Sequence, residues 1–230
     1  MVNTSRSELR AANSEQRPAR LGWPGWGPVS GLTFVVVFVA SLFMDTTPDA
    51  NASNTAWTSY FATASHRETA LAAGFLGVVA ALAVMSFLVI TWTRIAAAGR
   101  PGLASPLPVA AAAVCAACIA AGSLLQALIP GSMVFNSLPE PSPDIMRVLS
   151  QAAGPLILVG GMLALALAMA SLALQARAAR AFGTTLTIFT LITAVITVFS
   201  FQFFPMLAPL VWTVTLSIVL IRRPALTPQA

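Results

Sequence analysis

No charged side chain occurs between residues 182 and 221, a stretch of forty residues. As one straight helix this stretch would be about 60 Å long, twice the roughly 30 Å hydrocarbon core of a bilayer. The chain therefore has to turn back, and the local helix breakers lie around Pro205, from Gln202 to Met206. We expect two membrane spans here, at 182–201 and 203–221. The alternative is a single tilted span with a re-entrant end.

The composition is that of a membrane protein. Hydrophobic residues make up 57% of the chain and charged residues only 8%, against about 25% charged residues in an average soluble domain. So little charge cannot cover a water-facing surface. Four more apolar segments of about the length needed to cross a bilayer lie at 29–44, 69–92, 106–129 and 152–174. The predicted fold class is all-α, a polytopic transmembrane helical bundle with six spans within residues 23–223.

Polar tails flank this bundle. Residues 1–22 have no apolar periodicity that would bury a face, which is typical of a disordered tail, and 224–230 form a second, short tail. The first apolar segment follows too long a polar stretch for an ordinary secretory signal and precedes no small-residue cleavage pattern, so we interpret it as an uncleaved span. Trp23 and Trp26 suit the headgroup level at its start.

The charges divide unequally between the two sides of the membrane. With six spans and a cytoplasmic N-terminus, the cytoplasmic side holds ten arginines and two glutamates, a net charge of +8. The outer side holds Arg67 and Arg147 with five carboxylates, a net charge of −3. This asymmetry follows the positive-inside rule, whereas five spans would leave Arg222 and Arg223 outside. We predict a multi-pass protein of a bacterial plasma (inner) membrane with both termini cytoplasmic.

The residue types present exclude several functions. All twelve basic residues are arginine, which excludes a P-loop and a Schiff-base lysine. The lack of lysine together with the alanine-rich composition points to a GC-rich bacterial genome. The spans hold no ionisable side chain, which argues against proton-coupled transport, voltage sensing and haem binding. The single histidine, His66, falls in an outer loop. We predict no metal, no cofactor and no nucleic-acid partner, because topology and anionic inner-leaflet lipid explain the pI near 11.

The first of two long outer loops, residues 45–68, predicts a short amphipathic helix on the outer face. Behind Ser53 as a candidate N-cap, apolar residues recur at helical spacing: Trp57, Tyr60, Phe61 and Ala64. We favour an interfacial anchor, and the alternative is a lid over a site between the helices. In the second loop, 130–151, Asp144 is the expected cap of a helix that enters the fourth span and kinks at Pro155.

Cys115 and Cys118 in the third span place two thiols on adjacent turns of one helix face. In redox enzymes such a CxxC pair attacks disulfides or quinones once its pKa is lowered. Here the pair lies near mid-bilayer among small residues, with no histidine or arginine nearby in the sequence. We favour packing in a helix interface, and thiol redox chemistry is the alternative.

The fifth and third spans carry polar side chains that are not ionisable. Four threonines of the fifth span share one stripe: Thr187, Thr190, Thr193 and Thr197. We expect their hydroxyls to bond back to their own helix while packing against a neighbour, rather than to line a polar path. For Gln126 and Gln202, near the outer ends of spans, we expect interhelical hydrogen bonds, with the lining of an outward-facing pocket as the alternative.

Small residues predict which helices pack most closely. They are spread through the second, third and fourth spans: Gly74, Gly77, Ala110 to Ala113, Gly122, Gly154, Gly160 and Gly161. Such residues let helix backbones approach in lipid, so these spans are expected to form the centre of the bundle. The fifth and sixth spans, rich in Phe, Ile and Val, are expected to be more exposed to lipid.

The order of these features resembles a widespread type of uncharacterised six-span membrane protein of high-GC actinobacteria, classed under domains of unknown function. The matching segments are MDTTPDANASNTAWTSYFATASHRE after the first span, PEPSPDIMRVLSQ at the entry to the fourth, and the closing FFPMLAPLVWTVTLSIVLIRR. The resemblance covers roughly residues 23–223. It implies an inner-membrane location and six helices, and it assigns no functional residue.

The favoured functional hypothesis is a membrane scaffold or accessory protein that is not an enzyme. Its partners are membrane lipids and another membrane protein or further copies of itself. The alternative is a carrier or binder of a small lipophilic or lipid-like molecule, held in an outward-open cleft under the helix of the first outer loop. No catalytic, cofactor-binding or metal-binding residue is assigned.

The charge map predicts the outcome of a topology experiment. A reporter fused after Arg223 is expected to be cytoplasmic, and a reporter inserted between Asp45 and Arg67 is expected to be external. Paired alkaline phosphatase and green fluorescent protein fusions measure both locations. An external C-terminal reporter would contradict the six-span topology.

Overall fold

The computed structural model of the chain describes residues 26–99, 105–202 and 204–222. Every regular element within these ranges is a helix, so the all-α class is confirmed. Trp23 and the tails expected at 1–22 and 224–230 lie outside the described residues. In chain order the elements are α2 (Trp26–Met44), α3 (Asn54–Ala62), α4 (Ala64–Ala98), α5 (Leu107–Phe135), α6 (Pro143–Pro155), the π-helical η1 (Leu156–Gly161), α7 (Met162–Ala178), α8 (Thr184–Val198), the 3₁₀-helical η2 (Phe204–Met206) and α9 (Leu207–Arg222).

Five of the helical stretches are long and apolar enough to cross a membrane. They are Trp26–Met44, Ala64–Ala98, Leu107–Asn136, Pro143–Ala178 and Phe204–Arg222. These stretches contain the cores of five expected spans and mark the protein as membrane-embedded. The segment expected to span at 182–201 forms α8, an apolar helix of only 15 residues. At 1.5 Å per residue α8 rises about 22 Å, less than a full hydrocarbon core.

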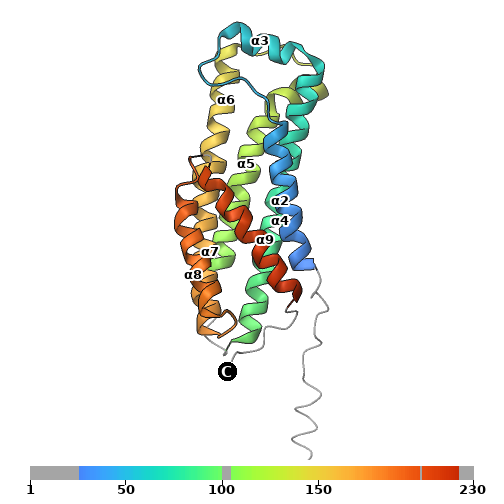
Figure 1. Ribbon diagram of the computed structural model, residues 1–230. Coiled ribbons are helices and arrows are strands. Elements are labelled where there is room, and N and C mark those ends of the chain that lie inside the picture. The colour runs from blue at the N-terminus through green and yellow to red at the C-terminus, as the bar shows by residue number, and fades with distance from the viewer. Residues whose placement is uncertain (1–25, 100–104, 203, 223–230) are drawn as a thin grey trace, which may run out of the picture.

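The long helices lie roughly side by side (Figure 1), and their contacts close a ring. α2 packs on α4, α4 on α5, α5 on α7, α7 on α8 and α8 on α9, and α9 returns to pack on α2. Large side chains from α2, α4, α7 and α9 fill its interior and are fully buried: Phe34, Phe87, Leu165, Met169 and Trp212. The Phe87 and Trp212 rings meet edge to face, with their centroids 5.9 Å apart, and so join α4 to α9 across the interior.

Three of the helices are longer than the bilayer is thick. α4 has 35 residues and α5 has 29, which correspond to about 52 Å and 44 Å, whereas the 19 residues of α2 rise about 28 Å. The third, the continuous helix from α6 through α7, covers Pro143–Ala178. Their surplus length lies at the end of the molecule that α3 crosses (Figure 1). We call this end the cap; it consists of residues 45–73, which include α3, and residues 126–155, which include α6.

Three expectations about helix ends require correction. α5 does not stop at Ile129 but continues through Pro130, which is buried, to Phe135. A proline within a helix lacks a donor and crowds the carbonyl four residues earlier, and burial of the Pro130 ring and of Ile129 beside it offsets this cost. The cap of α6 is Ser142 rather than Asp144, because Pro143 takes the first helical position that proline favours. His66 lies in the first turns of α4, which begins at Ala64, rather than in a loop.

At Pro155, where we expected a kink, the helix changes from α to π geometry. α6 ends at Pro155, six π-helical residues follow, and α7 continues from Met162. A proline within a helix clashes with the carbonyl four residues earlier and lacks the donor that this carbonyl needs. The wider π turn accommodates this local defect without ending the helix.

Glycines set the closest helix contacts, as the small-residue pattern predicts. A Cβ built on Gly74 would lie 2.6 Å from Ala127 Cβ and 2.8 Å from the carbonyl oxygen of Ser123, so α4 and α5 touch almost backbone to backbone. A Cβ on Gly122 would lie 2.9 Å from the carbonyl oxygen of Ala153 and 2.5 Å from Ile157 Cγ1. The centre of the bundle therefore includes the expected second, third and fourth spans.

The expectation about lipid exposure was wrong in part. Within its apolar window, α9 has 44% of its residues buried, the same share as α5, because it lies against α2 and α8 and carries Trp212 into the interior. The least buried of the five long helices is α2, with 28%. Amino-acid size alone does not reveal exposure, because large side chains fill the interior of the ring as well as facing lipid.

Gly122 and Gly154 form a matched pair for testing these contacts. Gly122→Ala is expected to destabilise the protein by about 1–3 kcal/mol, because the added methyl group meets the Ala153 carbonyl and Ile157. Gly154→Ala meets no atom within 4 Å and is expected to be neutral or stabilising by about 0.5–1 kcal/mol through helix propensity. The midpoint of thermal unfolding in a mild detergent measures both. Equal shifts in the two variants would contradict the packing described.

Candidate functional site

Cys115 and Cys118 pack against the π-helical segment. Cys115 is fully buried and Cys118 is half-buried, and both are free thiols. A Cβ on Gly160 would lie 3.0 Å from Cys118 Sγ, and one on Gly161 would lie 3.8 Å from the carbonyl oxygen of Cys115. The Cys118 side chain thus occupies space that Gly160 leaves open, and Cys115 is buried in the main core, as expected for the packing role that we favoured.

The threonine stripe of α8 forms no open polar path. Thr187, Thr190, Thr193 and Thr197 are buried, and each hydroxyl donates to the carbonyl oxygen four residues earlier at 2.8–3.1 Å. The expected back-bonding is therefore confirmed. Thr190 has a second role, since the indole Nε1 of Trp212 donates to its Oγ1 at 3.1 Å. This bond joins α8 to α9 inside the bundle.

Polar side chains come together at the cap, and Asp45 is the residue that joins them. Asp45 directly follows α2, and its Oδ2 accepts a hydrogen bond from Gln126 Nε2 of α5 at 3.0 Å. Its Oδ1 accepts from the backbone N–H of Thr47 at 3.2 Å and from Thr47 Oγ1 at 2.8 Å. Gln126 therefore makes the kind of bond between segments that we expected, whereas the Gln202 side chain is exposed.

Arg147 makes the second polar connection in the cap. Its NH2 group donates to the carbonyl oxygen of Ala52 at 3.0 Å and to Asn54 Oδ1 at 2.9 Å. Its NH1 group lies 3.2 Å from Asp144 Oδ1. Arg147 of α6 thus holds the start of α3, across more than ninety residues of sequence. Arg67 acts similarly from α4, because its NH1 donates to the carbonyl oxygen of Phe61 at 3.0 Å.

The aromatic side chains of α3 are buried in protein. Ser53 is the N-cap as expected, and its Oγ accepts from the backbone N–H of Ala56 at 3.2 Å. Three aromatic residues of α3 form a small core with two residues of α5 and α6: Trp57, Tyr60, Phe61, Ile129 and Met146. The apolar side of α3 therefore contacts the other cap helices, not lipid, and the expected interfacial anchoring is wrong for these residues. Ala64 is exposed and belongs to α4.

Tyr60 links the aromatic core of the cap to its polar side chains. Its hydroxyl lies 3.2 Å from Thr46 Oγ1, and its ring stacks on the His66 imidazole with centroids 4.7 Å apart. Burial raises the pKa of the Tyr60 phenol, the hydrogen bond with Thr46 opposes this shift, and the nearby Asp45 carboxylate adds to it. The phenol therefore stays protonated at neutral pH, which keeps its O–H available for a hydrogen bond.

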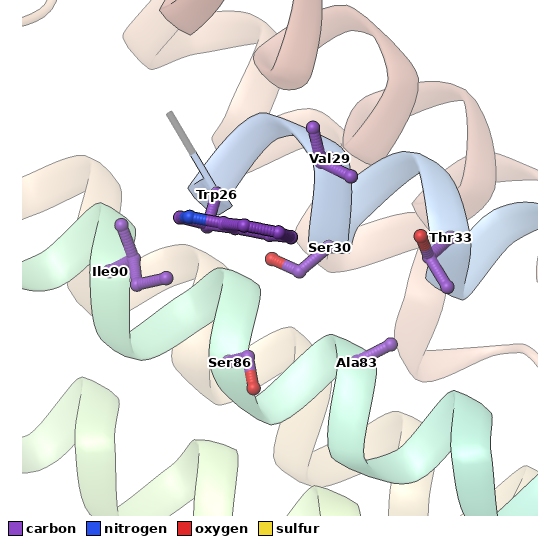
Figure 2. Close-up of a pocket in the computed structure, with 7 residues that line it drawn as sticks. All are labelled: Trp26, Val29, Ser30, Thr33, Ala83, Ser86 and Ile90. Carbon is purple, nitrogen blue, oxygen red and sulfur yellow. The ribbon is translucent and has the colours of Figure 1, made fainter. Parts of the chain in front are cut away.

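A groove that the sequence interpretation missed lies between α2 and α4. Its volume is about 360 Å³, and seven residues line it: Trp26, Val29, Ser30, Thr33, Ala83, Ser86 and Ile90. In Figure 2 the Trp26 indole lies between the two helices, near Ser30 and Ile90. Spacings of three, four and seven on each helix place these residues on facing sides, but no sequence signal tells which two helices face each other.

The described charged residues gather at the two ends of the bundle. The end at which α4, α7 and α9 finish carries only arginines: Arg94, Arg177, Arg180 and Arg222. The cap end carries five carboxylates and two arginines: Asp45, Asp49, Arg67, Glu68, Glu140, Asp144 and Arg147. Within the described ranges, no group of three or more His, Cys, Asp or Glu side chains is placed to hold a metal ion.

Comparisons with known proteins give no relative for this chain. No family model, no curated protein and no solved structure matches it.

The hydrogen bond between Trp212 and Thr190 can be tested against a neighbouring threonine. Thr190→Val leaves the buried indole N–H without its partner and is expected to cost about 1–3 kcal/mol. Thr193→Val removes only a bond back to the Phe189 carbonyl of its own helix, so a much smaller effect is expected. Thermal unfolding in detergent, followed by circular dichroism, compares the two. A larger loss for Thr193→Val would contradict the assigned role of Thr190.

Proposed function

We propose that the protein is a six-span scaffold or accessory protein of a bacterial plasma membrane, is not an enzyme, and recognises its partner through the cap. In this proposal α8 is the fifth span and α9 the sixth. The turns at 199–202 and 204–206 then supply the length that the 15 residues of α8 lack. The likeness of layout to six-span actinobacterial proteins supports the same arrangement.

The distribution of charge supports the orientation. The end with Arg94, Arg177, Arg180 and Arg222 has no carboxylate among the described residues. By the positive-inside rule this end is cytoplasmic, and the cap with its carboxylates is on the outer side. Both termini then lie in the cytoplasm, and α3 is a helix of the outer face.

The membrane-embedded part offers little chemistry to a substrate. Its buried threonine hydroxyls donate to carbonyls of their own helices, and the described spans between the two charged ends carry no Asp, Glu, His, Lys or Arg side chain. Ionisable groups in a membrane are costly and mark transport paths and catalytic sites. Their absence from this part of the described chain supports a role in binding rather than in turnover.

One observation carries the proposal: apolar side chains are exposed on α6 beyond the reach of the bilayer. Ile145 is 52% exposed and Val148 is 63% exposed, and they lie about one helical turn apart. Val148 is thirty residues from the end of α7 at Ala178, which corresponds to about 45 Å of helix against about 30 Å of hydrocarbon. Apolar groups exposed together outside lipid are typical of a surface that binds another protein.

A lipophilic carrier with its cleft under α3 is the less favoured alternative. The space between α3 and the ends of α5 and α6 is filled, since Trp57 and Phe61 are each 1% exposed and Met146 is fully buried. Asp45 and Gln126, the polar groups of that region, are bonded to each other. An outward-open cleft at this place would require α3 to leave its contacts.

Site-specific cross-linking tests the proposed partner surface. A photoreactive benzophenone amino acid at Val148 is expected to give a discrete protein adduct in cells of the native host. The same probe at Leu167 of α7, which is 48% exposed and about 16 Å from Ala178, is the lipid-facing control and is expected to give none.

The Ile145→Glu variant then tests whether the surface itself is recognised. It is expected to reduce the Val148 adduct about tenfold, equivalent to about 1.4 kcal/mol of binding, without changing the unfolding temperature. A normal level of folded protein with no adduct at Val148, or with an adduct unaffected by Ile145→Glu, would overturn the proposal.

A further inference from the structure

The groove between α2 and α4 opens on the surface of the membrane-embedded part. α2 is the least buried of the long helices, and the groove lies on its first two turns, facing residues 83–90 of α4. The two helices come very close at its end, where a Cβ on Gly27 would lie 2.7 Å from Ile90 Cγ2. The groove therefore has a tight wall beside Trp26 and lies within the part of both helices that crosses the bilayer.

The surface of the groove is mostly hydrocarbon, and both of its serine hydroxyls are bonded within their own helices. Ser30 Oγ donates to the carbonyl oxygen of Gly27 at 2.8 Å, and Ser86 Oγ donates to that of Leu82 at 2.8 Å. Most other lining groups are hydrocarbon, from Val29, Ala83 and Ile90. Its volume of about 360 Å³ lies within the roughly 300–1,000 Å³ range of ligand pockets. This surface suits an alkyl chain better than a polar molecule.

The positive charge at the Trp26 end of the groove favours a lipid whose headgroup is negatively charged. Arg94 follows Ile90 by four residues, so it lies about one helical turn further along the same face of α4. The described charged residues at this end are all arginines. Trp26, which is 72% exposed, stands at the level where indole rings meet lipid headgroups. A negative headgroup is stabilised there, whereas a zwitterionic one gains less.

We propose that the groove between α2 and α4 binds one acyl chain of an anionic phospholipid, with the phosphate group beside Trp26 and Arg94. The small side chains of Ala83, Ser30 and Ser86 leave room for a chain but not for another helix, which is about 10 Å across with its side chains. The site is independent of the cap and of the proposed partner surface. It serves lipid recognition in the leaflet at the arginine-rich end.

Photoactivatable phosphatidylglycerol, with a diazirine in its acyl chain, locates the site. The full chain is reconstituted into nanodiscs of phosphatidylcholine with a few per cent of the probe, irradiated and digested. Adducts are expected to concentrate on residues 26–33 and 83–90. Adducts spread evenly over the lipid-facing sides of α5, α7 and α9 would overturn the proposal, because they would indicate only bulk lipid contact.

Variants separate the acyl chain from the headgroup. Ser86→Trp fills the groove from an exposed position and is expected to reduce the adducts at least fivefold. Leu82→Trp places the same ring on the exposed side of α4 but outside the lining, and is expected to leave them unchanged. Equal effects of the two tryptophans would overturn the site. It would also be overturned if the protein were a dimer and Ser86→Trp dissociated the two copies while leaving the adducts unchanged.

Native mass spectrometry from mixed micelles tests the charge preference. The wild-type protein is expected to retain phosphatidylglycerol over phosphatidylcholine by about tenfold, and Arg94→Gln is expected to remove most of that preference while adducts at residues 83–90 persist. Equal retention of the two lipids by the wild-type protein would overturn the anionic assignment. If Arg94→Gln does not unfold cooperatively, Arg94→Lys is measured in addition. This variant keeps the charge and is expected to restore the preference for phosphatidylglycerol.

Discussion

The backbone contact between α4 and α5 is the constraint on which the rest of the structure depends. In lipid, helices gain no hydrophobic free energy by associating, so they need close packing instead. Gly74 meets Ser123 and Ala127 at distances that leave no room for a Cβ, and Gly122 repeats this contact with the next helix. With α4, α5 and α7 fixed in this way, α2, α8 and α9 complete the ring and enclose Phe87 and Trp212.

Polar groups are distributed in two ways that match their surroundings. Along α8 each buried threonine bonds within its own helix, so that no partner from elsewhere is needed, and only Trp212 adds a bond between helices. In the cap, by contrast, Asp45 and Arg147 connect segments far apart in the chain. Close packing of complementary helix surfaces therefore holds the membrane-embedded part together. Hydrogen bonds between segments, around a small aromatic core, hold the cap together.

Features that depend on residues close in the sequence could be predicted from it. Ser53 as an N-cap, the threonine back-bonds and the irregular helix at Pro155 depend on neighbours within a few residues, so they were predictable. The end of α5 at Phe135 and the start of α6 behind Ser142 were predicted less well, because tertiary burial and the preference of proline for the first turn decide them. The cap contacts of Asp45 and Arg147, and the groove beside Trp26, depend on which helices are neighbours, which composition and spacing do not encode.

The π-helical segment between α6 and α7 lets one helix meet two different surroundings. Inserting a residue into a helical turn shifts every later side chain by about 100° around the axis. In the sequence, the buried positions of α6, Met146 and Ala153, are thus out of phase with the buried positions of α7, such as Leu165 and Met169. A period of 3.6 residues counted back from the buried residues of α7 would therefore assign the wrong residues of α6 to the buried side.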